Sequence, residues 1–272
     1  MKLEEAIFTV FDFETTGLYP YSGDRICEIG AIRAKAGRKT IEKFHKVVDP
    51  KRPISAGAFY VNGITTDMVK GKPTIDKALP GFLKFIKGSV LVAYNAGFDL
   101  GFLENALGDD REILDGYLII DALGLARRLF PDAARYNLGA LSLSLGFLSR
   151  VEHRAMADAM MTWKIFEKEV GLLEAEGVKT VEEIAGMHPR KRPSPLKAVK
   201  DYKFRLIENA IRDQKRLNIT YRSVWNNAVT ERTVTPLEIR RGYDKSYLIA
   251  HCHLKNEERN FRFDGIIAAE TA

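Results

Sequence analysis

Two acidic residues, Asp12 and Glu14, lie two positions apart at the end of a stretch rich in β-branched and aromatic residues, 7–13. Because side chains alternate between the two faces of a strand, both carboxylates project from the same face. Two like charges on one face repel each other, which costs stability unless a cation or a positive side chain lies between them. The pair therefore fits either a cation site or a solvated strand end.

Asp99, His153 and Asp158 are further candidates for the same chemistry. Asp99 follows an apolar stretch and a turn, so it falls near the start of a helix, where a capping role is the alternative. His153 and Asp158 are five positions apart, which on one continuous helix would separate them by roughly 140°. They converge only if His153 precedes the helix and Asp158 lies in its first turns. Otherwise they are an exposed histidine beside a capping aspartate.

Together these side chains offer four carboxylates and one imidazole at strand ends and helix starts of one predicted layer. Oxygen ligands suit hard divalent cations such as Mg²⁺ or Mn²⁺. Cysteine and histidine form no cluster of the kind that holds structural zinc. The residues therefore predict a divalent-cation site.

Strands and helices that could position these residues alternate along residues 7–170. Three early strands with short links favour an antiparallel meander, and later strands that alternate with helices favour parallel pairing. The prediction is an α/β fold with a mixed sheet flanked by helices. The expected strands are residues 7–13, 26–34, 40–48, 89–94 and 117–120, and the expected helices are 75–86, 98–107, 121–130, 137–146 and 155–170.

The pattern weakens after residue 170. Residues 188–197 contain three prolines and four basic residues, which is typical of an inter-domain linker. Beyond them we expect a small mainly-β module with an N-terminal helix: a helix at 202–217 and strands at 217–222, 229–234, 246–251 and 260–263. The predicted domains are residues 1–172 and 201–272, with residues 173–200 as the linker.

Positive charge is concentrated around that linker. The 272 residues carry a net charge of +6, and residues 190–222 alone hold 11 lysines and arginines against 3 acidic residues. Such a stretch attracts a polyanion such as nucleic acid, although a solvated linker before an ordinary basic helix explains the same count. No apolar run approaches the roughly 20 residues of a membrane span, and the two cysteines cannot build a disulfide framework. We expect a cytoplasmic protein without a membrane segment.

Three motifs, in order, resemble those of the DnaQ-like exonucleases, a proofreading family with an RNase H-like core. They are residues 11–18 (FDFETTGL), 95–99 (NAGFD) and 153–158 (HRAMAD), supported by 26–31 (ICEIGA), 61–65 (VNGIT) and 121–123 (DAL). The likeness covers residues 7–170 and is nearest to the exonuclease of the Gram-positive-type replicative polymerase and to free-standing epsilon-like proteins. Asn62 departs from it, because many relatives carry histidine or threonine there.

The resemblance implies a 3′-to-5′ exonuclease that uses two divalent ions, Mg²⁺ or Mn²⁺, and releases nucleoside 5′-monophosphates. It implies that Asp12 bridges both ions, that Glu14, Asp99 and Asp158 complete the coordination, and that His153 takes the proton of the attacking water. The residues expected to hold the terminal nucleotide are Phe13, Thr15, Thr16, Gly17, Leu18, Asn62 and Phe98. For Leu18 and Phe98, packing in the protein core is the alternative to packing against bases.

Residues 203–268 resemble the WYL domain, a small barrel-like module of the SH3 or Sm type found in bacterial regulators. Ser246 stands in place of the tryptophan of the name-giving triplet, and Gly265 in place of a common arginine. The resemblance implies that Tyr221, Tyr247 and Arg262 hold nucleic acid or sense a ligand, with dimerisation or docking as the alternative. It rests on residues 207–211 (IENAI), 217–221 (LNITY), 247–252 (YLIAHC) and 261–266 (FRFDGI).

Two hypotheses follow from these motifs. The first is an active exonuclease acting on single-stranded DNA or frayed 3′ ends, with the basic module holding the strand. The second is a nucleic-acid-binding or regulatory protein on a retired nuclease fold. A retired site usually loses at least one of its ligands, and all five candidate residues are present here. An exoribonuclease that trims RNA 3′ ends stays open, because the sequence does not show a 2′-hydroxyl contact. A polymerase, another repair protein or a second copy of the chain is a further candidate partner.

Overall fold

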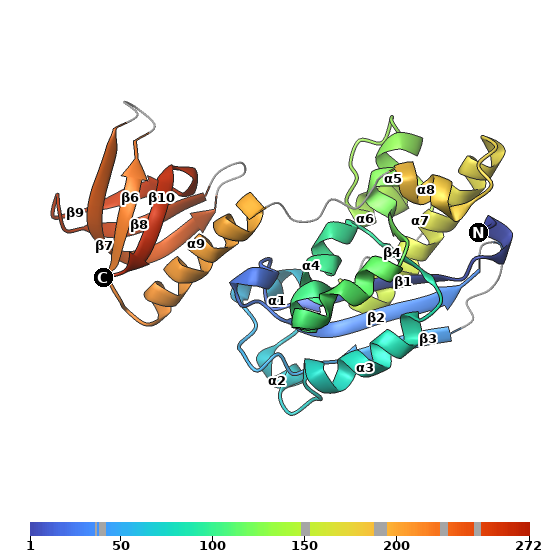
Figure 1. The fold of residues 1–272 in the computed structure, drawn as a ribbon, viewed down its shortest axis with the longest axis horizontal. Coiled ribbons are helices and arrows are strands. Elements are labelled where there is room, and N and C mark those ends of the chain that lie inside the picture. Colours follow the sequence, from blue (N-terminus) through green and yellow to red (C-terminus); the bar gives the residue numbers. More distant parts are fainter. Residues whose placement is uncertain (36, 38–41, 148–152, 188–194, 224–227, 242–245) are drawn as a thin grey trace. The chain divides into compact units, whose positions relative to one another are not determined.

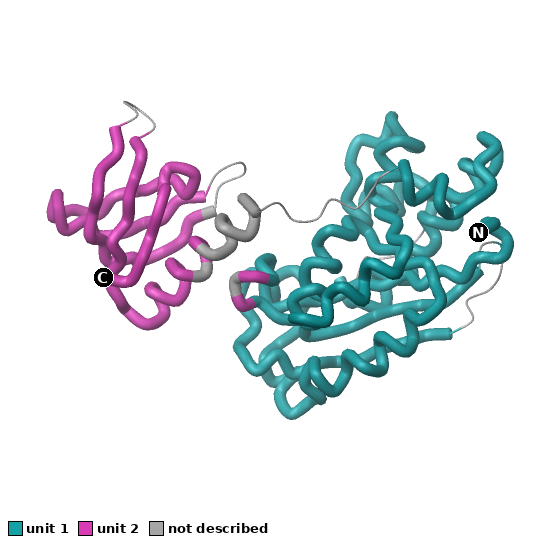
Figure 2. The backbone as a smooth tube through the Cα atoms, viewed as in Figure 1, with its two compact units in different colours: residues 1–20, 24–192 teal, residues 21–23, 193–272 magenta. Residues whose placement is uncertain are grey.

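Two compact units make up the chain in the computed structural model, which describes residues 1–272 apart from 36, 38–41, 148–152, 188–194, 224–227 and 242–245. Unit 1 comprises residues 1–20 and 24–192, and unit 2 comprises residues 21–23 and 193–272 (Figure 2). Part of the predicted linker, residues 188–194, lies outside the described residues. Within the described ranges, no helix combines the length and the apolar character needed to cross a membrane.

Unit 1 is built on a five-stranded mixed sheet (Figure 1). Its strands are β1 (Phe8–Thr15), β2 (Ile26–Ala34), β3 (Glu42–Val47), β4 (Val90–Ala93) and β5 (Ile119–Asp121). The order is β3-β2-β1-β4-β5: β2 is antiparallel to β1 and β3, whereas β4 is parallel to β1 and β5. The predicted meander followed by parallel strands is confirmed. Residues 40 and 41, the predicted start of the third strand, lie outside the described residues.

Helices pack on both faces of this sheet, as predicted (Figure 1). They are α1 (Ala56–Asn62), α2 (Thr66–Val69), α3 (Ile75–Ile86), α4 (Ala96–Leu107), α5 (Ala122–Leu129), α6 (Leu138–Ser144), α7 (Ala155–Ala175) and α8 (Val181–Met187). The short helices α1 and α2 were not predicted. Each starts at a capping hydroxyl, Ser55 or Thr65, which accepts a backbone N–H three residues on.

The alternation of side chains along β1 places the two acids. Phe11 and Phe13 point into a core shared with α3 and α4. Phe8 and Val10 point into the opposite core, shared with α7 and α8. Asp12 and Glu14 continue the row of Phe8 and Val10, so their carboxylates reach the α7 side of the sheet.

Residues 173–187, which we predicted as part of the linker, pack into unit 1. Helix α7 continues to Ala175, five residues beyond its predicted end, and α8 follows. Leu173, Val181 and Ile184 are buried in the core on the α7 side of the sheet. The physical reason is this apolar row, which buries its surface only against the sheet. The compact unit therefore extends well past residue 172.

Unit 2 is an antiparallel sheet with one helix, which confirms the predicted β module with an N-terminal helix. The elements are α9 (Pro195–Arg212), β6 (Leu217–Arg222), β7 (Val229–Arg241), β8 (Ser246–Cys252), β9 (Glu257–Arg262) and β10 (Ile266–Thr271). The order is β10-β6-β7-β8-β9, and Phe204 of α9 stacks on Phe263 at 3.7 Å between ring centroids. Strand β10 was not predicted, because its sequence mixes isoleucine and alanine without a period of two.

Candidate active site

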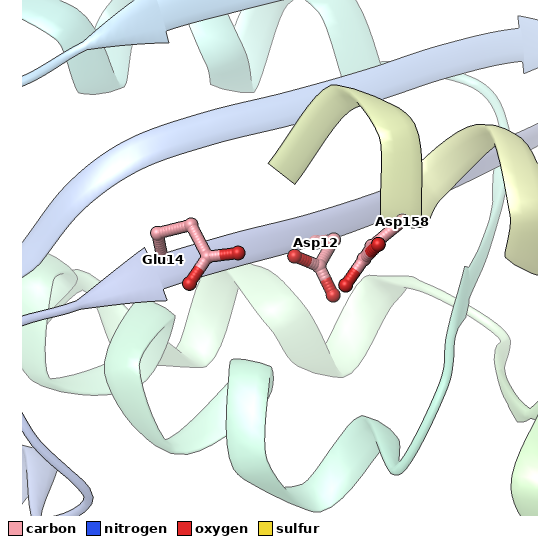
Figure 3. A group of neighbouring side chains, drawn as sticks. All are labelled: Asp12, Glu14 and Asp158. Atoms are coloured by element: carbon pink, nitrogen blue, oxygen red, sulfur yellow. The ribbon is translucent and has the colours of Figure 1, made fainter. Parts of the chain in front are cut away.

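Three carboxylates gather where β1 passes the start of α7 (Figure 3). Asp12 and Glu14 come from β1, and Asp158 comes from the first turn of α7. Each contributes one oxygen to a group whose members all lie within 4.8 Å of one another. The strand spacing of two and the helix start thus bring together three of the five predicted residues.

Asp99 lies beside this group, in the first turn of α4. It is buried, and its Oδ1 accepts the backbone N–H of Phe13 at 2.9 Å. Since Phe13 sits between Asp12 and Glu14 in β1, this bond ties Asp99 to the strand segment that carries them. Its charge is also the second cause, after burial, that raises the pKa of Asp12.

His153 precedes α7, as convergence with Asp158 requires. Its Nδ1 lies 3.8 Å from Oδ2 of Asp158, and its side chain is about half exposed. Its backbone φ of 43° lies in the left-handed region, which is uncommon for a residue other than glycine. Asp12, His153 and Asp158 together line a cleft of about 500 Å³. The imidazole is therefore in reach of both the acids and solvent.

Burial and mutual repulsion disfavour the charged forms of these acids. Desolvation, followed by the charges of Asp99 and Glu14, raises the pKa of Asp12 well above its usual value. Burial raises the pKa of Glu14 to about 8, although a hydrogen bond from Asn62 acts against it. Burial also raises the pKa of Asp99 to about 8 and that of Asp158 to about 6. So much negative charge in one place destabilises the site unless a cation offsets it.

The donor set fits a hard divalent cation. Asp12, Glu14 and Asp158 offer carboxylate oxygens at mutual distances that one ion can span, and Asp99 adds a fourth carboxylate nearby. Mg²⁺ and Mn²⁺ prefer such oxygen ligands. Binding would also relieve the repulsion that raises the pKa values of these groups.

The last residue of β1 and the loop after it provide four of the predicted nucleotide-binding residues, which differ in how accessible they are. The Thr16 hydroxyl is buried and donates to Asp24 at 2.9 Å, and the Thr15 hydroxyl donates to the Gly17 carbonyl at 2.6 Å. A Cβ at Gly17 would lie 2.3 Å from Oδ2 of Asp24, so the loop closes on Asp24 only with glycine there. These three residues shape the loop, whereas the Leu18 side chain is 58% exposed and stays accessible.

Three other residues predicted to contact the nucleotide lie in or against the protein core. The Phe13 ring is buried in the core, 5.2 Å from the ring of Phe11, so the predicted contact of its side chain with a nucleotide does not fit. Asn62 is buried and donates to the Thr15 carbonyl at 3.4 Å, so its side chain supports the site from within. Phe98 is half-buried against the core shared with α3 and α4, as the packing alternative requires, and its contact with a base stays a prediction.

The cleft extends beyond the predicted residues. Past His153 it is lined by Tyr94, Asn95, Leu123 and residues 136–139. The Tyr94 hydroxyl donates to the Tyr136 carbonyl at 2.6 Å and so fixes one wall. A signal for part of this wall was present in the sequence: Asn95 and Leu123 follow the carboxyl ends of parallel strands, where binding crevices of open α/β sheets form.

Family models match both units. Residues 9–166 match the model described as Exonuclease, and residues 202–271 match that of the WYL domain. The chain belongs to this exonuclease family. Among curated relatives, the chain matches a DNA polymerase III PolC-type of Caldanaerobacter subterraneus subsp. tengcongensis at 36% identity, over 80% of this chain and 15% of the relative. It also matches a DNA polymerase III subunit epsilon-like protein of Rhodobacter capsulatus at 38% identity, over 65% of this chain and 26% of the relative.

Solved structures give the same fold. Exonuclease X in complex with 5′ overhanging duplex DNA matches at 28% identity with a TM-score of 0.53, over 66% of this chain and 98% of that chain. The zinc-bound E. coli ExoI–ssDNA complex matches at 18% identity with a TM-score of 0.57, over 90% of this chain and 54% of that chain. The second likeness shows the fold alone. The chain spans only a small part of the length of the curated relatives described above.

Unit 2, which matches the WYL model, brings its three predicted residues near one another. Tyr247 on β8 is the ladder partner of Arg262 on β9. The pKa of Arg262 is raised mainly by its hydrogen bond to Asp264, and more weakly by Tyr247 and Tyr221. A Cβ at Gly265 would lie 2.8 Å from the ring of Tyr221, so the arginine common in relatives does not fit here without a shift.

Proposed function

We propose that unit 1 is a metal-dependent 3′-to-5′ exonuclease that acts on single-stranded DNA or frayed 3′ ends and releases nucleoside 5′-monophosphates. The observation that carries the proposal is the group of Asp12, Glu14 and Asp158 beside His153 at an open cleft. Membership of the exonuclease family supports it, as does the presence of DNA in the named complexes of similar structures.

The four acids are assigned to hold two divalent ions, Mg²⁺ or Mn²⁺. Asp12 is assigned to serve both ions and Asp99 to complete the set, an assignment supported by the 4.8 Å group of Asp12, Glu14 and Asp158 and by the bond of Asp99 to Phe13. Bound ions would neutralise charge on the scissile phosphate and lower the pKa of the attacking water. The protein's own part is to fix these oxygens by strand, helix and the Phe13–Asp99 bond.

His153 is assigned as the general base. Imidazole is the side chain most often used to take a proton from a reacting group. The Asp158 carboxylate lies 3.8 Å from Nδ1 of His153. The exposed Leu18 side chain and the half-buried Phe98 ring are assigned to grip the last bases by packing, which requires no particular sequence.

The test is shortening of 5′-labelled single-stranded DNA with Mg²⁺ or Mn²⁺, with the released nucleoside 5′-monophosphates identified by chromatography. We expect a ladder that shortens from the 3′ end with either ion, and no shortening with EDTA. A matched RNA oligonucleotide in the same assay separates a deoxyribonuclease from an RNA-trimming enzyme. No release from DNA or RNA, by protein whose fold and metal binding are verified, would overturn the proposal in favour of a retired nuclease fold that binds or regulates.

We further propose that unit 2 helps to hold the strand through Tyr221, Tyr247 and Arg262. Its support is the proximity of these side chains and the basic stretch at residues 190–222.

A polymerase, another repair protein or a second copy of the chain as partner stays a prediction, as does a cytoplasmic location. Sedimentation of the purified chain with and without single-stranded DNA tests the homodimer.

A further inference from the structure

Glu28, in the middle of β2, is buried next to the acids but has well-defined partners. Its Oε2 accepts Nε–H of Arg154 at 2.9 Å and the backbone N–H of Ala155 at 3.2 Å. Its Oε1 accepts Nη2–H of Arg154 at 2.6 Å and lies 2.7 Å from Nε2 of His45. Burial alone would raise the pKa of Glu28, but the hydrogen bonds from Arg154 and His45 hold it below its usual value. This carboxylate is therefore occupied and does not resemble a free ligand.

The same face of β2 touches the first turn of α7 directly. Gly30 lies two residues beyond Glu28, and a Cβ there would fall 2.2–2.4 Å from backbone atoms of Ala155 and Met156. Only glycine allows this approach. Glu28 is also the register partner of Glu14 on β1. The start of α7 is therefore fixed against β2 at the level of the acids of β1.

Arg154 links this contact to two residues of the site. It directly follows His153, and its carbonyl accepts the N–H of Asp158 at 3.0 Å, the bond that closes the first turn of α7. As the N-cap of α7 it makes no side-chain capping bond. Glu28 instead supplies, from β2, an acceptor for an N–H of the first turn. A carboxylate at a helix N-terminus is favoured as well by the helix dipole.

We propose that Glu28 and Arg154 form a positioning pair that sets His153 and Asp158 against Asp12 and Glu14. The inference rests on the proposed exonuclease function. The left-handed backbone of His153 is a strained conformation, which persists only where the surroundings over-determine it. The hydrogen bonds of the Arg154 guanidinium to Glu28 supply that constraint on the residue that follows His153.

Loss of the pair lowers turnover more than substrate binding. Arg154→Met removes the charge and both hydrogen bonds to Glu28 but keeps an unbranched apolar stem. We expect kcat to fall by about 10²-fold, the loss typical of a misplacement of about 1 Å, with KM within about threefold. Arg154→Lys keeps the charge without the guanidinium and recovers part of kcat. Independently of activity, calorimetric titration with Mn²⁺ gives an affinity about 10-fold weaker for Arg154→Met, because Asp158 moves. Glu28→Gln lowers kcat in the same direction.

Leu173→Ala is the matched control, because it removes a buried side chain near the far end of the same helix. We expect it to lower the unfolding temperature at least as much as Arg154→Met while kcat and Mn²⁺ affinity stay at the wild-type level. An equal loss of kcat in Leu173→Ala, or unchanged kcat and Mn²⁺ affinity in Arg154→Met, overturns the positioning role. An inactive wild type contradicts the exonuclease proposal instead, and the Mn²⁺ affinities then decide the positioning role alone. Arg154→Lys and Glu28→Gln serve if Arg154→Met fails to fold.

Discussion

The candidate sites of unit 1 and unit 2 differ in how their charged side chains are arranged. In unit 1, Asp12, Glu14 and Asp158 lie together, and burial raises the pKa of each. In unit 2, Arg262 forms an ion pair with Asp264, two residues further along the chain. One site concentrates charge of one sign, and the other balances its charge locally.

The difference indicates where the arrangement of charge lowers the stability of the fold. Like charges brought together out of water oppose folding, and such clusters occur at functional sites more often than elsewhere. An ion pair near the surface costs little to maintain and contributes little. We therefore expect catalysis to depend steeply on the acids of unit 1 and binding to depend only mildly on unit 2.

Asp12→Ala gives the largest expected effect. Because Asp12 is assigned to serve both ions, its loss lowers kcat by at least about 10³-fold, which is about 4 kcal/mol of barrier, and leaves DNA binding largely intact. Single-turnover cleavage and fluorescence anisotropy with labelled DNA measure the two quantities. Glu42→Ala, an exposed acid on β3, is the control. A near-normal rate in Asp12→Ala refutes the metal assignment.

His153→Gln comes next. Removal of a general base lowers kcat by roughly 10²- to 10⁴-fold. Mn²⁺ affinity should stay close to the wild-type value, because the acids are untouched. Steady-state kinetics and calorimetry on the same protein sample check both statements. A variant that loses metal binding along with turnover shows that His153 acts through the cation site and not as a base.

Much of the fold and the site could be predicted, and the exceptions share a cause. The bounds of β2 and α3 match the prediction because local periodicity determines them. The pairing of Glu28 with Arg154 spans 126 positions in the chain, so no local pattern shows it. The burial of the Phe13 ring and the apolar packing of residues 173–187 likewise depend on distant partners.

Glu169→Gln tests a buried carboxylate of unit 1 away from the site. In the described part of the chain neither oxygen of Glu169 has a hydrogen-bond partner, and burial followed by the charge of Asp121 raises its pKa well above the usual value. Burial, followed by the charge of Glu169, in turn raises the pKa of Tyr94. A raised folded-state pKa gives stability that is complete below the unfolded pKa and is lost as pH rises towards the folded one.

Between pH 5 and pH 8 the wild type should therefore lose more unfolding free energy than Glu169→Gln, by at least about 1 kcal/mol. Denaturant melts at the two pH values measure it. Glu174→Gln, at an exposed position of the same helix, should follow the wild type. Parallel pH dependence in Glu169→Gln and the wild type contradicts a buried, uncompensated carboxylate.

Arg262→Ala gives the smallest expected effect. It should raise KM for a long single strand by about two- to fivefold and reduce the slope of log affinity against log salt by about 1, while kcat on a short oligonucleotide stays unchanged. Kinetics at several salt concentrations check this. A loss of kcat on the short substrate would place unit 2 in the chemistry and remove the contrast between the two sites.

The most direct test of the central claim is anomalous diffraction from crystals soaked with Mn²⁺ and a nucleoside 5′-monophosphate. We predict two manganese peaks about 4 Å apart between Asp12, Glu14, Asp99 and Asp158, with Asp12 touching both. Peaks elsewhere, or acids that stay without manganese at concentrations that support cleavage, would contradict the account.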